Sequence, residues 1–160
     1  MNSLLKINEL TTLQELKALI EMGLNVNEKD INGCTPLMFA SAKTREQEII
    51  KELIKAGANV NDVCRNNKTV LMIAAHLNRK SEIISCLIEA GADVNAKNIT
   101  NGTALMYAAG YSLNPKIISI LIDAGADINA KDDEGNNAFL HAMKHNKNKK
   151  IQLLLRSLKE

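Results

Sequence analysis

His141 and His145 have the spacing that comes nearest to a chemical site in this 160-residue sequence. They lie four residues apart in a segment expected to be helical, so their side chains would share one helix face. Two histidines in this arrangement can bind zinc, and metalloproteases combine them with an intervening glutamate. Here no glutamate lies between them, and the sequence assigns no third ligand. Two solvent-facing histidines are therefore the preferred interpretation, with a metal site as the alternative.

The three cysteines, Cys34, Cys64 and Cys86, form neither a CxxC pattern nor an even-numbered disulfide framework. Cys34 and Cys64 fall in successive expected loops but at different places within them, which argues against a shared zinc ion. Cys86 lies in an apolar helical segment and is expected to be a small core residue. The sequence suggests no Ser-His-Asp or Cys-His arrangement and no glycine-rich phosphate loop. We therefore predict that the protein is not an enzyme and needs no cofactor.

Charge and hydropathy argue against a nucleic-acid or membrane partner. The net charge is +2 with acidic and basic residues interspersed, whereas nucleic-acid-binding domains gather basic residues on one face. The lysines between residues 144 and 150 are interpreted as a solvated face, with an acidic partner as the alternative. No window of about 18 residues is apolar enough to span a bilayer, and the N-terminal MNSLLKINEL lacks the apolar core of a signal peptide. Reduced cysteines then indicate a cytoplasmic location, or the host cytosol if the protein is secreted without a classical signal.

A 34-residue period organises the elements that would position these side chains. The motif Thr-x-Leu-Met begins a new segment at each of three positions, Thr35, Thr69 and Thr103. A fixed period in this range is typical of stacked repeat proteins. Because 46% of the residues are hydrophobic but only 2% are aromatic, Ile, Leu, Met and Ala are expected to fill the core. The same interval separates the glycines Gly23, Gly57, Gly91 and Gly125.

Each unit is predicted to contain two helices. The threonine can cap the first helix by accepting a hydrogen bond from an unpaired amide of its first turn. Pro36 follows at a position where its missing N–H costs nothing. The second helix carries an apolar stripe, Ile83, Ile84, Leu87 and Ile88 in the central unit, wide enough to contact the layers on both sides. The glycine at its end is expected to take the left-handed conformation that closes a helix.

The two ends of the array differ from its middle. Glu15 stands where Ile49 stands in the next unit, and Gln152 and Arg156 replace the residues equivalent to Ile50 and Ile54. A terminal repeat has no neighbour on one side and must be polar there. We therefore expect a complete, capped and monomeric stack. The predicted single domain spans residues 1–160, with an N-terminal cap repeat at 1–31, internal repeats at 32–65, 66–99 and 100–133, and a C-terminal cap repeat at 134–160.

These motifs resemble those of the ankyrin repeat family. TPLMFA at 35–40 resembles the family's Thr-Pro-Leu-His-x-Ala, and EAGADVNA at 89–96 and DAGADINA at 123–130 resemble its helix end and loop. The family's usual period is about 33 residues, and the additional residue here lies between the two helices. Methionine or leucine takes the place of the family's histidine, and Asn137 replaces the fourth threonine. A tetratricopeptide array is the less favoured alternative, because its Trp, Gly, Tyr and Pro signature is missing.

The resemblance implies an all-α fold, an ankyrin-type helix-turn-helix repeat solenoid with projecting β-turn loops. Loop tips and first helices would form a concave face, with the second helices behind them. It also implies a non-enzymatic protein–protein interaction module that binds a partner protein through that face. Two alternatives stay open: a structural, self-associating repeat protein, and a secreted effector or inhibitor that binds a host or regulatory protein.

The expected partner-binding residues are those that this architecture exposes and the repeat does not fix. Tyr111 is the leading one, since tyrosine is enriched in binding hot spots. Tyr107, in the same register as Phe39, could equally pack between first helices. Arg65 and Lys68 could pair with an acidic patch or be ordinary loop charges. The full set is Asn32, Lys43, Arg65, Asn66, Lys68, His76, Leu77, Thr100, Tyr107, Tyr111, Glu134 and His145, and Asn136 is a further loop position expected to be exposed.

Overall fold

The structure, a computed structural model, describes residues 12–77 and 80–158. Part of the expected N-terminal cap, residues 1–11, lies outside the described residues. One loop contains a short antiparallel hairpin, β1 (Val63–Cys64) and β2 (Lys68–Thr69), closed by a 3₁₀ turn at Arg65–Asn67. The helices are α2 (Leu13–Glu21), α3 (Pro36–Lys43), α4 (Gln47–Lys55), α5 (Val70–Leu77), α6 (Ser81–Glu89), α7 (Ala104–Tyr111), α8 (Pro115–Asp123), α9 (Ala138–His145) and α10 (Lys149–Ser157).

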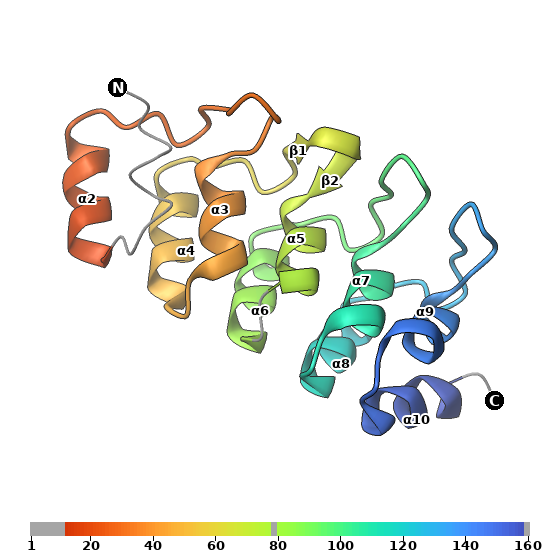
Figure 1. Ribbon diagram of the computed structural model, residues 1–160. Coiled ribbons are helices and arrows are strands. Elements are labelled where there is room, and N and C mark those ends of the chain that lie inside the picture. The colour runs from red at the N-terminus through yellow and green to blue at the C-terminus, as the bar shows by residue number, and fades with distance from the viewer. Residues whose placement is uncertain (1–11, 78–79, 159–160) are drawn as a thin grey trace.

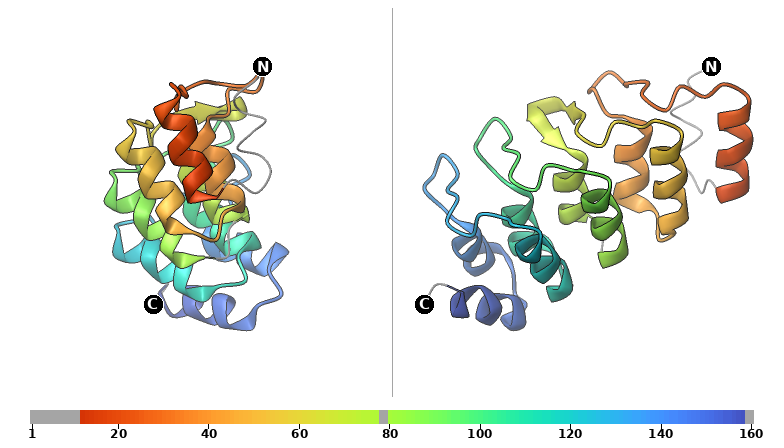
Figure 2. Two further views of the ribbon diagram at one scale, coloured as in Figure 1. Left: turned by 90° about the vertical axis from the view of Figure 1, so that its left-hand side faces the viewer. Right: turned by 180° about the vertical axis from the view of Figure 1, so that it is seen from behind.

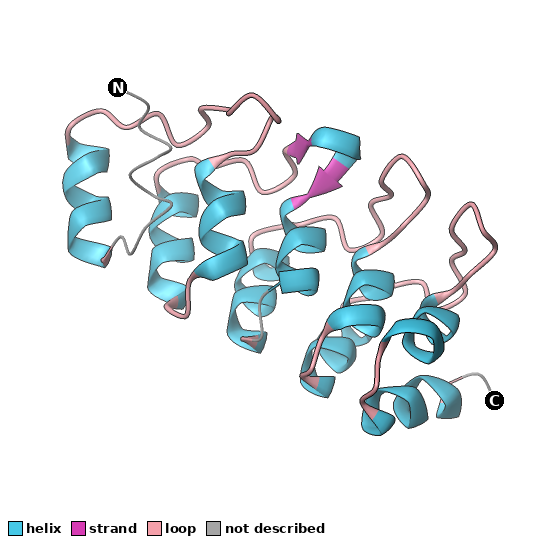
Figure 3. Cartoon of the chain, in the orientation of Figure 1, coloured by secondary structure: helices cyan, strands magenta, loops and turns pink. Residues whose placement is uncertain are grey.

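The helices stack in two rows, which confirms the all-α solenoid (Figure 1). First helices α3, α5, α7 and α9 pack side by side, and second helices α2, α4, α6, α8 and α10 form the other row. The loops before the first helices project from the same side of the stack in every view (Figure 2). Apart from the β1–β2 hairpin, the described connections are loops and turns (Figure 3). We call the exposed surface of the first helices and of these loops the concave face.

Small and aliphatic side chains fill the space between the rows, as the composition predicts. Ile83, Ile84 and Leu87 of the predicted stripe are fully buried, and Ile88 is half-buried. The equivalent positions on α4 and α8 follow the same pattern. Burial of such a stripe supplies most of the stability of a short helix, because an isolated nine-residue helix is marginal in water.

The start of each first helix largely agrees with the capping prediction. Thr69 Oγ1 accepts from the Met72 amide at 3.3 Å, and Asn137, which replaces threonine in the last unit, caps α9 through its side chain. Thr35 departs from the prediction. Its Oγ1 is buried without a hydrogen-bond partner, because the Met38 amide donates to the main-chain carbonyl of Thr35 instead, at 3.0 Å.

The glycines that follow the second helices take the predicted left-handed conformation. Gly91, with φ +87°, donates its amide to the Ile88 carbonyl, and the Ala92 amide donates to Leu87. This pair of bonds satisfies carbonyls that the end of a helix leaves open. The chain then turns toward the next loop, so one residue type per repeat sets the angle between helix and loop.

Asparagine side chains connect successive loops, a feature that our sequence analysis did not predict. Asn95 donates through Nδ2 to the Gly125 carbonyl at 2.9 Å, and its Oδ1 accepts from the Asp127 amide at 2.8 Å. Asn27 and Asn61 make the equivalent pair of bonds one repeat apart. Each asparagine thus ties the end of one second helix to the loop of the preceding unit.

Replacing Asn95 with alanine is expected to lower the free energy of unfolding by about 1 kcal/mol, because two exposed hydrogen bonds between repeats are lost. Asn129 provides a matched control, since it occupies the same register and its side chain bonds to no later loop among the described residues. Asn129→Ala should change the free energy by less than about 0.5 kcal/mol. Urea denaturation followed by circular dichroism measures both, and equal effects would contradict a role in joining repeats.

The two ends carry the polar positions that the sequence analysis singled out, with additional roles. Glu15 is exposed, and its carboxylate accepts from the Thr12 amide at 2.8 Å in a capping box. Gln152 is half-buried and donates to the carbonyls of Asn146 and Ala142 near the end of α9. Arg156 is exposed. Glu15 and Gln152 therefore satisfy backbone groups as well as interrupting the apolar stripe.

Candidate functional site

All three histidines and both tyrosines of the chain lie in one row on the concave face. His76 of α5 stacks on Tyr107 with ring centroids 5.5 Å apart and lies 4.6 Å from the Tyr111 ring, both on α7. Tyr111 stacks in turn on His145 of α9 at 5.7 Å, and His145 lies 5.9 Å from His141. We call these five residues the aromatic row. It crosses three successive repeats without a break.

The repeat itself explains how the row is aligned. Tyr107 and His141 are one period apart, as are Tyr111 and His145, so each pair occupies one register on adjacent first helices. Gly110 lies between these registers on α7, and a Cβ there would be 3.8 Å from the Cβ atoms of both histidines. At this distance a methyl group would make ordinary van der Waals contact, so α7 and α9 pack closely here and their rings can stack.

Polar groups orient the first part of the row. Asn98 is buried and donates through Nδ2 to the Tyr107 hydroxyl at 2.9 Å. Lys68 Nζ lies 5.3 Å from the centroid of the same ring, within cation–π range. Burial and the Lys68 charge lower the pKa of His76, so His76 is neutral at pH 7. Tyr107 is thus held in place, whereas Tyr111 remains 47% exposed.

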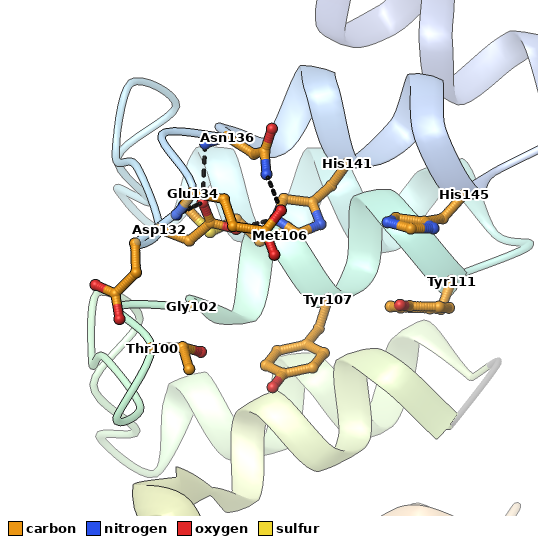
Figure 4. Close-up of a pocket in the computed structure, with 11 residues that line it drawn as sticks. Thr100, Gly102, Met106, Tyr107, Tyr111, Asp132, Glu134, Asn136, His141 and His145 are labelled. Atoms are coloured by element: carbon orange, nitrogen blue, oxygen red, sulfur yellow. Dashed lines mark hydrogen bonds and ion pairs between the residues drawn. The ribbon is translucent and has the colours of Figure 1, made fainter.

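A pocket of about 360 Å³ opens beside the row, between α7, α9 and the two loops that precede them (Figure 4). Tyr107 and Tyr111 project into it from α7, and His141 and His145 project from α9. Thr100 and the stretch from Asp132 to Glu134 close it on the loop side. The pocket therefore joins an aromatic wall to a loop wall that carries three carboxylates.

Asp132 organises the loop wall. Its Oδ1 accepts from the amides of Asn136 at 2.8 Å and Glu134 at 3.0 Å, and its Oδ2 lies 2.8 Å from His141 Nε2. Burial opposes ionisation of Asp132, but the Asn136 amide and His141 outweigh it, and the pKa of Asp132 falls below its ordinary value. Asp132 is therefore a carboxylate at neutral pH.

Asn136 extends this network. The sequence predicted that it would be exposed, but it is buried. It is only 6% exposed, because Nδ2 donates to Glu134 at 3.0 Å and Oδ1 accepts from Lys144 Nζ at 2.8 Å. Lys144 Nζ also lies 3.8 Å from the Glu134 carboxylate. The loop before α9 is thus fixed by side chains of its own unit.

His141 does not face solvent, so the interpretation of His141 and His145 as two solvent-facing histidines was wrong for His141. Its side chain is 19% exposed, and its Nδ1 is buried without a hydrogen-bond partner while Nε2 meets Asp132. The reason is its register, which is that of Phe39 and Tyr107, on the side of the first helix toward the loops. His145, one turn later, is exposed as expected.

Cys34 and Cys64 lie closer together than their different places in successive loops suggested. Burial, together with the nearby Cys64 thiol, raises the pKa of the Cys34 thiol to about 12. The β1–β2 hairpin brings them together, since the Arg65 amide donates to the Asn32 carbonyl at 2.7 Å. Cys86 is buried on α6, as predicted.

A family model of ankyrin repeats, which represents three copies of the repeat, matches residues 7–98 and again residues 78–160. The chain belongs to the ankyrin repeat family. Ankyrin repeats are generally protein–protein interaction modules, and proteins built from them are typically not enzymes. No curated protein matches this chain at a significant level.

The ankyrin fold brings together about half of the side chains predicted to contact a partner. His76, Tyr107, Tyr111 and His145 form most of the aromatic row, with Lys68 over one ring. Two further predicted residues, Thr100 and Glu134, line the pocket. The others lie apart from the row: Asn32, Arg65 and Asn66 are exposed in the first two loops, and Lys43 and Leu77 border a separate hollow.

Asp132 and His141 are the site residues that our sequence reasoning missed. Asp132 was not singled out in the sequence, and His141 was considered only as a solvent-facing histidine or, with His145, as a zinc ligand. The available signal was register: His141 stands one period after Tyr107, which was already a candidate. Aligning the ankyrin repeats position by position would have placed the Tyr107 and His141 rings in one row.

Among residues 12–77 and 80–158, no three His, Cys, Asp or Glu side chains are grouped so that they could hold a metal ion. His141 is engaged by Asp132, and no third ligand group joins the two histidines in the described chain. In the same residues no helix is long and apolar enough to cross a membrane.

Proposed function

We propose that this ankyrin repeat protein binds a partner protein through its concave face, with the aromatic row at the centre of the contact. The row is the observation that carries the proposal. Tyr111 is 47% exposed although it has aromatic neighbours on two sides. Partly exposed, positioned aromatic side chains are typical of binding hot spots, because they bury a large area and lose little conformational entropy.

Hydrogen bonds between the loops support a rigid binding surface. The Ile99 amide donates to the Asn66 carbonyl at 3.1 Å, and the Asp133 amide donates to the Thr100 carbonyl at 3.1 Å. Each loop that borders the face is therefore tied to the next. A surface held in this way loses little entropy on binding, so more of the contact energy appears as affinity.

Combined substitution of Tyr111, His76 and Arg65 by alanine is expected to reduce partner capture at least tenfold. A central aromatic hot spot alone contributes about 2 kcal/mol, or roughly 30-fold in affinity. Wild type and variant, each checked for folding by circular dichroism, are immobilised and exposed to an extract of the source cell. Captured proteins are quantified by mass spectrometry.

A second triple variant controls for the other side of the molecule. Lys51, Glu89 and Asp123 are exposed on the second helices α4, α6 and α8, and their replacement by alanine should leave capture unchanged. If the concave-face variant retains its partners, or if the control loses them, the concave face is not the binding surface.

Self-association is a second candidate, favoured by one observation. Leu140, Met143 and Leu153 are exposed on the last two helices, by 37%, 53% and 63%. A protein that stacked end to end could cover them. Light scattering on the purified chain distinguishes the two candidates, since we propose a monomer. A reducing location, the cytoplasm or a host cytosol, belongs to the same proposal and is supported by the free thiols.

A further inference from the structure

We propose that the pocket between α7 and α9 receives an arginine side chain of the partner protein. This inference rests on the proposed function and adds the chemistry that the partner must present. Three properties of the pocket support it: its charge, its aromatic wall, and the oxygen atoms that the loop wall leaves accessible.

The charge of the pocket differs from that of the whole chain. The residues that line it include Asp132, Asp133 and Glu134 but no lysine or arginine. The chain as a whole carries a net charge of +2. The lining therefore carries three carboxylates on a slightly basic protein, and Lys144 Nζ, 3.8 Å from the Glu134 carboxylate, offsets part of their charge. Such a pocket attracts a cationic group and disfavours an anionic one.

The aromatic wall favours the same class of ligand. The face of a tyrosine ring attracts a cation, and Tyr107 already has Lys68 Nζ at 5.3 Å from its centroid. Tyr111 lies between His76 and His145 and is still 47% exposed, so a planar group at the mouth of the pocket can pack against the open part of its ring. A guanidinium is planar and stacks on aromatic faces, whereas an ammonium is a compact point charge. This difference selects arginine over lysine.

The loop wall offers oxygens at a suitable place. Asp132 has both oxygens occupied by loop amides and His141, so it supplies charge rather than a free acceptor. Asp133 and Glu134 are exposed. Asp133 has Oδ1 bonded to Asn101 Nδ2, and Glu134 has only Oε2 in a hydrogen bond with Asn136. One oxygen of each carboxylate therefore stays open for the N–H groups of a guanidinium.

Peptide selection tests this proposal without knowledge of the natural partner. A random dodecapeptide display library is selected on the full chain, and the best peptides are synthesised. Both tyrosines lie in the aromatic row and the chain has no tryptophan, so tyrosine fluorescence reports directly on the site when the peptide lacks Tyr and Trp. In each peptide, arginine is then replaced by citrulline, which keeps the shape but lacks the charge, and by lysine.

Arginine should recur in the selected peptides, and its replacement by citrulline should weaken binding at least tenfold, or about 1.4 kcal/mol. Lysine should restore only part of the affinity. The double variant Asp133→Asn, Glu134→Gln should weaken the arginine peptide by a similar factor and leave its citrulline form unaffected. Glu89→Gln, Asp123→Asn makes the same charge change on the second helices and should alter binding by less than twofold.

The outcomes separate this inference from the function on which it rests. Peptides that lack arginine yet lose affinity for Tyr111→Ala would refute the arginine pocket and leave the concave face as the binding surface. Peptides that bind Tyr111→Ala as well as wild type would refute both. Failure to select any peptide, or equal binding of arginine and citrulline forms, would also count against an arginine pocket.

Discussion

Leu87→Ala is expected to lower the free energy of unfolding by about 3 kcal/mol. Leu87 lies on α6 in the central unit and is fully buried. The helices α4, α5 and α8 pack around α6, so the cavity left by the missing atoms has rigid walls on several sides. A site that cannot collapse loses both the transfer free energy of the side chain and the packing around it.

Leu155 on α10 provides a graded comparison, and Leu153 on the same helix provides a control. Leu155 is also fully buried, but α10 packs mainly against α8 and α9, at the end of the described stack. Its replacement by alanine should lower the free energy of unfolding by about 2 kcal/mol, because the cavity can relax on the side where no further helix of the described chain packs. Leu153 is 63% exposed, and its replacement should cost less than about 0.5 kcal/mol. Urea denaturation measures all three, and equal costs at positions 87 and 155 would contradict this account.

The helical frame was predictable from sequence because local interactions determine it. Gly91 ends α6 with a positive φ, which is a property of one residue and its own turn. The apolar stripe from Ile83 to Ile88 follows from helical periodicity alone, and its burial agrees with it. Repetition then confirmed each signal, since the same residues recur one period later. Thr35 failed as a side-chain cap because a main-chain carbonyl can serve the same amide.

The site was only partly predictable because it depends on contacts between repeats. The thiols of Cys34 and Cys64 meet through a hairpin whose register no local pattern encodes. Asp132 holds its own loop through the Glu134 and Asn136 amides, but its link to α9 depends on His141 lying 2.8 Å away. Individual candidates such as Tyr111 could be identified from exposure, whereas their assembly into a row required the spacing between adjacent helices.

One register on the first helices contributes both to packing and to the proposed binding site. Phe39, Ile73, Tyr107 and His141 occupy one register, and all four are half-buried. The first two are apolar, and the last two carry the aromatic row and the pocket. The change from apolar to polar side chains along this register marks where the proposed binding surface begins. It also explains why the proposed site lies toward α9 and away from α3.

Asn146→Ala is expected to lower the free energy of unfolding by about 2–3 kcal/mol and to open the last repeat. Asn146 is 5% exposed, and its Nδ2 donates to the carbonyls of Ala109 at 2.9 Å and Ser112 at 2.7 Å. These acceptors belong to the end of α7 and the turn after it, so the bonds join adjacent units. Alanine would leave two buried carbonyls without these donors, and an unsatisfied buried polar group costs about 1–3 kcal/mol.

Asn148, in the same turn, is the matched control. It donates to Leu113 at 3.1 Å and caps α10 through Lys150, but these bonds are exposed to water. Asn148→Ala should therefore cost only about 1 kcal/mol, the usual effect of losing an N-cap. Native-state hydrogen exchange distinguishes the two variants, because stability in a repeat array passes between neighbouring layers. In Asn146→Ala, amides of α9 and α10 should lose protection while those of α5 and α6 keep it.

The same variant connects the last repeat to the proposed function. His141 and His145 form one side of the pocket, and both belong to the unit that Asn146 ties to α7; His141 also contacts Asp132 in the loop before it. When that unit opens, the stack of Tyr111 on His145 is lost even though both side chains are intact. Asn146→Ala should therefore weaken binding at the concave face without altering any residue in contact with a partner. Unchanged binding in a variant with exposed α9 amides would show that the partner contacts only the earlier repeats.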